Sequence, residues 1–231
     1  MPFGVFERGE EKMINCEGGV SLAQQTLQSV SGGSNPTPSH HINWVVECSP
    51  KTIEDLIKKY HYLGDKPFRK GYSFALRHKG FIKGGLIWHG LSAPETTVGA
   101  FGLDRKNQDG FFELGRLVVL PELNGKGITS FFISHSIRLL RKKTNVRALI
   151  TYADSERHNG IVYRASNFKY YGLTKKKKDF YINGKIKERG KTKTLSGEWK
   201  DRSRKHRYML VFDKTLTIKW KQNYYKKEAK K

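Results

Sequence analysis

The chain has 231 residues, enough for one domain with a substantial hydrophobic core and appendages. Lys and Arg number 44 against 21 Asp and Glu, and the resulting net charge of +23 makes nucleic acid the expected partner. We expect a cytoplasmic protein without membrane contact, because no apolar run approaches the roughly 18 residues of a membrane helix and no signal peptide is visible. The only two cysteines, Cys16 and Cys48, argue against a disulfide framework or a cysteine-rich zinc site.

The charge is concentrated in the last third of the chain. From residue 164 to residue 231 there are 23 Lys and Arg against six Asp and Glu, which accounts for +17 of the total. We expect this part to face phosphate. A basic surface that is merely solvated, or that associates with ribosomes, is the alternative, since charge alone does not specify a ligand.

The first elements follow a poorly patterned N-terminus. Residues 1–41 show no sustained periodicity and end in a cluster of Gly, Ser, Asn and Pro, so we expect a poorly ordered extension. Residues 42–48 form the first predicted strand. Ser49 and Pro50 then provide an N-cap and a preset first residue for a helix over Thr52 to Tyr60.

A hairpin and a central strand are predicted next. Residues 72–78 and 82–89 flank a short turn, and Gly84 with Gly85 predicts either a bulge or a close approach by another element. Residues 110–120 carry the apolar run LVVL and end at a proline, which is typical of a central strand.

The remaining pattern alternates helices and strands. We expect a helix over 128–143, a strand over 146–151, a helix with apolar positions at 161, 162, 165 and 168, and strands over 169–173 and 208–212. A basic hairpin is expected over 175–193 around Asn183-Gly184. This order predicts an α/β fold with a mixed sheet and flanking helices in one domain, residues 42–213, followed by a basic tail, residues 214–231.

A glycine-containing turn lies between the central strand and the helix over 128–143. Glycines there would let backbone N–H groups converge at a helix N-terminus, where the helix dipole favours phosphate. We therefore predict a cradle for the pyrophosphate of coenzyme A, although a plain connecting turn explains the segment equally well. Its residues are Leu120, Asn124, Gly125, Lys126, Gly127, Ile128 and Thr129.

The segment YADSERHNGIVYRASNF, which begins at Tyr152, carries an acid, a histidine and a tyrosine where a strand gives way to a helix. Such positions are common sites of chemistry in α/β proteins, and we expect Asp154 and Tyr163 around one helix N-terminus. Arg116, inside an apolar strand, should be neutralised by Asp154, by Glu113 or by a bound anion, because burial of an unpaired charge is costly.

Four separated segments carry a resemblance to a known family. They are KYHYLG from Lys59, ELGRLVVLPE from Glu113, the segment from Tyr152, and RYMLVFD from Arg207. The order of elements resembles the fold of the GNAT acyltransferases, whose coenzyme loop the glycine turn matches only partly. The four segments together resemble the Mom family of phage DNA-modification proteins, over about residues 42–213.

The resemblance implies an activity and a set of functional residues. It implies conversion of adenine in DNA to its carbamoylmethyl derivative, which protects phage DNA from host restriction enzymes. The family's functional positions fall on His61, Tyr62, Arg116, Asp154 and Tyr163. It also implies acetyl-CoA and iron as cofactors.

The chemistry of the residues is consistent with a metal but leaves alternatives. Carbamoylmethylation joins nitrogen to a methyl-derived carbon, and acid–base groups alone do not break that C–H bond. His61, Asp154 and His158 offer the two histidines and one carboxylate that commonly hold redox-active iron, although either histidine could be structural. Tyr163 could protonate a leaving thiolate, steer the metal, or be a core aromatic.

The expected DNA surface lies in the basic hairpin. We expect its Lys and Arg to bind the phosphates of double-stranded DNA and its aromatic residues to stack on bases, with the target adenine flipped out of the duplex. The basic residues are Lys175, Lys176, Lys177, Lys178, Lys185, Lys187 and Arg189. Two alternatives are a conventional acetyltransferase acting on RNA, protein or a small amine, and a DNA-binding protein without activity.

Overall fold

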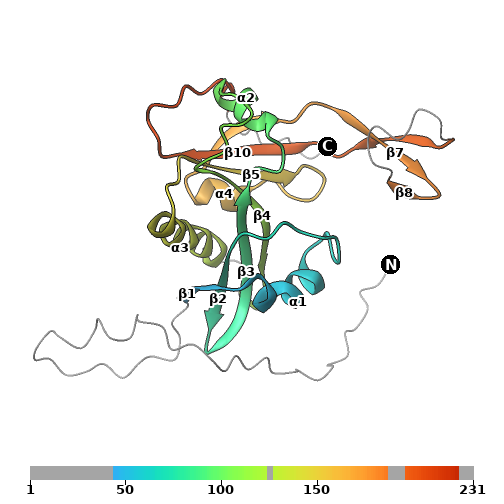
Figure 1. The fold of residues 1–231 in the computed structure, drawn as a ribbon. Helices are drawn as coiled ribbons and strands as arrows, with labels where there is room; N and C mark the ends of the chain where they lie inside the picture. Colours follow the sequence, from blue (N-terminus) through green and yellow to red (C-terminus); the bar gives the residue numbers. More distant parts are fainter. Residues whose placement is uncertain (1–43, 124–126, 187–195, 224–231) are drawn as a thin grey trace, which may run out of the picture.

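The computed structural model describes residues 44–123, 127–186 and 196–223. The elements, shown in Figure 1, confirm the predicted α/β class with a mixed sheet. In chain order they are β1 (Trp44–Cys48), α1 (Pro50–Tyr60), β2 (Tyr72–His78), β3 (Phe81–Gly90), α2 (Glu95–Phe101), β4 (Phe111–Val119), a 3-10 turn (Pro121–Leu123), α3 (Ile128–Lys143), β5 (Ala148–Asp154), α4 (Ile161–Ala165), β6 (Lys169–Leu173), β7 (Lys177–Ile182), β8 (Lys185–Ile186), β9 (Glu198–Arg202) and β10 (Lys205–Val211).

Seven strands form the main sheet in the order β1-β2-β3-β4-β5-β10-β6. Every neighbouring pair is antiparallel except β4 with β5, which run parallel. The ladder between β4 and β5 covers only residues 111–113 and 148–150. Past this ladder β4 continues to Val119 and β5 to Asp154, so the two strands separate in the middle of the sheet.

Helices α1 and α3 cover opposite faces of the sheet (Figure 1). Alternate residues of β2 explain this arrangement, because Phe74 packs in one hydrophobic cluster with residues of α3 and Ala75 packs in another with Ile53 of α1. A Cβ atom on Gly85 would lie 2.9 Å from the Cβ atom of Ile53. The close approach predicted at this glycine is therefore confirmed.

Helix α1 begins as its sequence predicts. Ser49 is the N-cap, and its hydroxyl accepts a hydrogen bond from the backbone N–H of Thr52 at 3.3 Å, while Pro50 is the first helical residue. The helix ends at Tyr60, and the backbone N–H of His61 donates to the carbonyl of Ile57. His61 is therefore the C-cap residue of α1, and its backbone is held at the end of the helix.

A second, three-stranded sheet of order β8-β7-β9 projects beyond the main sheet (Figure 1). We call residues 175–186 and 196–202 the finger. The predicted turn at Asn183-Gly184 is confirmed, because both residues adopt positive φ angles between β7 and β8. The sequence did not predict β9.

Other differences from the predicted elements concern length and position. Strand β5 runs to Asp154 rather than ending at Thr151, α4 has only five residues, and α2 was not predicted at all. Part of the expected tail packs on the domain, since the N–H of Lys219 donates to the carbonyl of Ala100 at 2.7 Å. Within the described residues, the helices are too short or too polar to cross a bilayer.

Candidate active site

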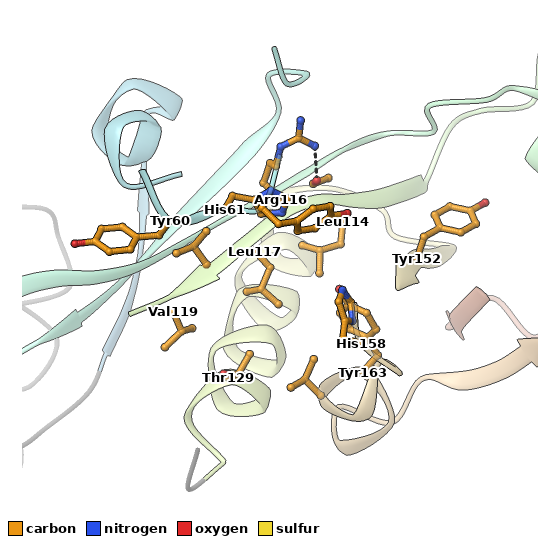
Figure 2. A pocket seen from close by; sticks show the side chains of 14 residues that line it. Tyr60, His61, Leu114, Arg116, Leu117, Val119, Thr129, Tyr152, His158 and Tyr163 are labelled. Atoms are coloured by element: carbon orange, nitrogen blue, oxygen red, sulfur yellow. Dashed lines mark hydrogen bonds between the residues drawn. The ribbon is translucent and has the colours of Figure 1, made fainter. Parts of the chain in front are cut away.

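A cavity of about 370 Å³ opens where β4 and β5 separate (Figure 2). Segments far apart in the sequence form its wall: the end of α1, strand β4, the start of α3, strand β5 and the residues around α4. The lining residues are Tyr60, His61, Tyr62, Leu114, Gly115, Arg116, Leu117, Val118, Val119, Thr129, Tyr152, His158, Val162 and Tyr163. The structure thus brings four of the five predicted catalytic residues, and His158, around one cavity.

His61 has one ring nitrogen engaged and one available. Its Nδ1 accepts a hydrogen bond from the backbone N–H of Leu63 at 3.2 Å, so the neutral ring carries its proton on Nε2. Burial, together with the charges of Arg116 and His158, lowers the pKa of His61 to about 4. The imidazole is therefore neutral at physiological pH and offers Nε2–H as a hydrogen-bond donor.

The depressed pKa of His61 makes the stability of the fold sensitive to mild acid. Between the unfolded value near 6.5 and the folded value of about 4, the unfolded chain takes up a proton at His61 that the folded protein excludes. The free energy of unfolding should therefore fall as pH drops through this window. His61→Asn keeps an acceptor for the Leu63 N–H, and urea unfolding at about pH 5 and about pH 7.5 should show a smaller loss in this variant. An unchanged loss would contradict the assignment.

Tyr62 lies beside His61 and forms an exposed part of the cavity rim. The two rings stack with centroids 4.5 Å apart, and the guanidinium of Arg157 lies 4.8 Å from the centroid of the Tyr62 ring. Burial raises the pKa of Tyr62, and the nearby charge of Asp154 raises it further. The contact with Arg157 joins the loop after α1 to the loop after β5.

Arg116 presents a charge that no carboxylate of the described residues neutralises within ion-pair distance. Its Nη1 donates to the carbonyl of Gly115 at 2.9 Å, as Figure 2 shows, and its Nη2 donates to the carbonyl of Pro67 at 3.3 Å. Its Nε is buried without a partner, and burial lowers the pKa of Arg116. Neither Glu113 nor Asp154, the two carboxylates expected from the sequence, forms an ion pair with Arg116.

Tyr163 lies on α4 with only 6% of its surface exposed, and it also lines the cavity. Its ring contacts those of Phe168 and Tyr208, with centroid separations of 6.3 and 5.5 Å. Burial raises the pKa of Tyr163, so its hydroxyl keeps its proton at neutral pH. The side chain is therefore a buried aromatic that carries a protonated hydroxyl and lines the cavity.

Tyr152 is a lining residue that the sequence analysis did not identify. It lies on β5 just past the part of the strand that pairs with β4, and burial together with Glu113 raises its pKa to about 12. The Nζ of Lys205 lies 5.9 Å from the centroid of the ring. The available signal was its place at the start of the segment YADSERHNGIVYRASNF, where a strand gives way to a helix.

Asp154 anchors the loop that carries His158. Its Oδ1 accepts from the backbone N–H of Glu156 at 3.1 Å, and its Oδ2 accepts from the Oγ of Ser203 at 3.0 Å. Its backbone carbonyl accepts from the N–H of His158 at 2.9 Å. Asp154 ends β5, from which the chain leads into α4 and Tyr163, but it is not among the residues that line the cavity. Its observed contacts position the loop.

His61, Asp154 and His158 do not fit a three-ligand iron centre. Across the part of the chain that the structure describes, no group of three or more His, Cys, Asp or Glu is placed to hold a metal ion. Both carboxylate oxygens of Asp154 accept hydrogen bonds, and the positive charge of Arg116 acts on His61, which disfavours a cation there. The predicted ligand set is therefore not assembled.

The predicted coenzyme cradle is described only in part. Asn124, Gly125 and Lys126 lie outside the described residues. Gly127 is the N-cap of α3 with a φ of 78°, a left-handed conformation that favours glycine. Ile128 begins the helix and Thr129 lines the cavity, so the N-terminus of α3 lies at the cavity wall. Leu120 precedes the 3-10 turn and donates its N–H to the carbonyl of Lys83.

The predicted nucleic-acid residues lie on the finger. Lys175, Lys176, Lys177, Lys178 and Lys185 are exposed, whereas Lys187 and Arg189 lie outside the described residues. None of the five described lysines lines the cavity. The contacts of Asp154 with Ser203 nevertheless join the cavity loop to the base of the finger.

Comparisons with known proteins place the chain in a family. Similar solved structures include a GNAT acetyltransferase from Streptococcus pneumoniae (11% identity, TM-score 0.46, 74% of this chain and 100% of that chain covered) and an IAA acetyltransferase from Bacillus cereus (10%, 0.47, 74% and 100%). A third is an acetyltransferase from Bacillus subtilis in complex with CoA (11%, 0.46, 74% and 99%). None of the curated proteins matches. The model of the Mom protein family matches residues 43–227, well over half of the sequence, and the chain therefore belongs to the Mom protein family.

Proposed function

We propose that the protein is a phage DNA-modification transferase that uses acetyl-CoA and converts adenine in DNA to N6-carbamoylmethyladenine. The observation that carries this proposal is the assembly of His61, Tyr62, Arg116 and Tyr163 around one cavity at the separation of β4 and β5. These residues come from three segments that resemble the family's motifs, and the family match covers all of them. The proposed place of action is the cytoplasm of the infected host.

The coenzyme end of the proposed site is the wall formed by β4 and α3. Leu117 and Val119 supply apolar surface along β4, which suits the arm of acetyl-CoA. At the same wall, the N-terminus of α3, where no side chain caps the helix, offers backbone N–H groups and a favourable dipole for a phosphate. The cavity thus combines an apolar channel with an anion-binding end.

The reacting end has donors of two kinds. His61 presents Nε2–H and Arg116 presents its charge, so together they would stabilise the negative charge that develops on the thioester oxygen when an amine nitrogen bonds to the carbonyl carbon and the C–S bond breaks. Tyr163 would deliver the proton that the leaving thiolate needs, because its hydroxyl stays protonated. His61 acts here as a donor and not as a general base, since its accepting nitrogen already binds the Leu63 N–H.

Plain N-acetylation is the second candidate, because it needs only the donors that the cavity already contains. Carbamoylmethylation instead joins N6 to the methyl-derived carbon, with loss of two protons and two electrons, and exchanges the thiolate at the carbonyl for an amide nitrogen, so it needs an oxidant and a nitrogen donor in addition to acetyl-CoA. Mass spectrometry of nucleosides from the DNA of cells that express this chain separates the two products by mass. Carbamoylmethyladenine supports the first proposal, acetyladenine supports the second, and unmodified DNA contradicts both.

The lysines of the finger should supply DNA affinity without sequence preference. Replacing Lys175, Lys176, Lys177 and Lys178 by Gln removes four exposed charges, so the slope of log affinity against log salt should fall by up to about 0.9 for each phosphate that is no longer neutralised. Filter binding of a DNA duplex across a range of salt concentrations measures this slope. Acetyl-CoA affinity is the control and should persist, whereas an unchanged slope would mean that this run is only a solvated surface.

A further inference from the structure

The finger has two faces of different character. Pairing of β7 with β9 places Phe180 opposite Trp199 and Lys178 opposite Asp201, and pairing with β8 places Lys185 opposite Ile182. These residues share one face, because directly paired residues of antiparallel strands point to the same side. We call this the Trp199 face.

The opposite face holds most of the acidic residues of the finger, and they are occupied. Asp179 forms an ion pair with Arg202 at 3.6 Å, and Glu198 forms one with Lys200 at 3.1 Å. These carboxylates therefore cancel local positive charge on their own face. Lys178 and Lys185 on the Trp199 face lie opposite only one acid, Asp201.

Trp199 is a large aromatic residue that is exposed to solvent. It is 56% exposed, and all five residues of β9 are exposed. Its ring contacts that of Phe180, which is 5% exposed, with centroids 5.1 Å apart and an interplanar angle of 52°. The ring contact with Phe180 restrains the indole, so binding of a ligand to its exposed surface costs little conformational entropy.

We propose that Trp199 stacks on a base of DNA that binds along the finger. An exposed aromatic residue beside lysines is the combination that binds stacked bases and phosphates together. The positive charge favours a polyanion over a second copy of this chain, which would carry the same charge to the interface. This inference takes DNA as the partner from the proposed function. It adds base stacking, which is not an ionic interaction.

The test compares Trp199→Ala with Ile186→Ala. Ile186 is 52% exposed and lies on the opposite face, where it pairs with Tyr181, so it is a matched apolar control. Affinity for an adenine-containing DNA duplex should fall about tenfold in Trp199→Ala, with an unchanged salt slope, because stacking of an indole on a base is not an ionic interaction. Trp199→Phe should restore most of the affinity, and Ile186→Ala should bind normally.

Tryptophan fluorescence gives a second readout. DNA should quench the emission of the wild-type protein, and Trp199→Phe should lose this quenching although it still binds DNA. Thermal unfolding of each variant confirms that the domain is intact. If a folded Trp199→Ala variant binds DNA with wild-type affinity, the stacking interaction is overturned and the proposed function is not. If the substitution changes the oligomeric state, the surface around Trp199 binds a second copy of the chain and not DNA. If the wild-type protein binds no DNA, both this inference and the proposed function are overturned.

Discussion

Replacement of Tyr163 by Phe is expected to lower the turnover of the proposed DNA modification by about 10²- to 10⁴-fold, the usual contribution of a positioned proton donor. The ring would remain packed against Phe168 and Tyr208, so the fold and the binding of acetyl-CoA and DNA should persist. Nucleoside mass spectrometry over a time course measures the rate. Tyr72→Phe, which removes a hydroxyl from a ring that packs on Phe112 away from the cavity, is the control.

The dependence on pH provides a further test of Tyr163. Because burial raises its pKa, the phenol stays protonated through neutral pH, and wild-type turnover should fall only in strongly alkaline solution as this proton is lost. The Phe variant should lack that alkaline decline. Full turnover in Tyr163→Phe would show that the hydroxyl is not needed and that Tyr163 is only a core aromatic.

The second large effect is expected at Arg116, where activity and stability should change in opposite directions. Arg116→Met removes a half-buried charge that has no carboxylate partner among the described residues, and the new side chain fills similar space. The free energy of unfolding should rise by about 1 kcal/mol, because an apolar side chain costs less to bury. Turnover should fall at least about a hundredfold, because the site loses a donor to developing negative charge.

Arg116→Lys separates charge from geometry. It keeps a cation but loses the fork that donates to Gly115 and Pro67, and activity should recover only in part. Urea unfolding and nucleoside analysis of both variants are the measurements. A Met variant that is less stable than the wild-type protein would show that the two backbone hydrogen bonds outweigh the cost of burying the charge.

Local signals predicted much of the fold. The start of α1 was readable because Ser49 and Pro50 act within one turn of the helix, and the turn of the finger was readable because Asn183 and Gly184 tolerate positive φ. Strand β9 was missed because all five of its residues are exposed, so no alternation of apolar and polar residues marks it. Helix α2 was missed for a related reason, since its seven residues complete barely two turns.

The site was harder to predict than the fold because its geometry is not local. The motif resemblance identified residues of the cavity wall, but the separation of β4 from β5 depends on how two distant strands pair, and no short pattern encodes it. Tyr152 was missed because an aromatic residue in a strand is usually a core residue. Asp154 was predicted as a ligand, while its contact with Ser203, 49 positions away in the sequence, depends on how β10 pairs with β5.

The attachment of the cavity loop to β10 has a mechanical consequence. The backbone N–H of Ser155 donates to the carbonyl of Arg204, next to the hydroxyl of Ser203 that holds Asp154. Both contacts lie between the last residue of β9 and the first residue of β10, where the chain leaves the finger. A force that tilts the finger therefore acts directly on the segment that carries Arg157 and His158. In the proposed function, binding of DNA to the finger would therefore be coupled to the alignment of the cavity rim through these two hydrogen bonds.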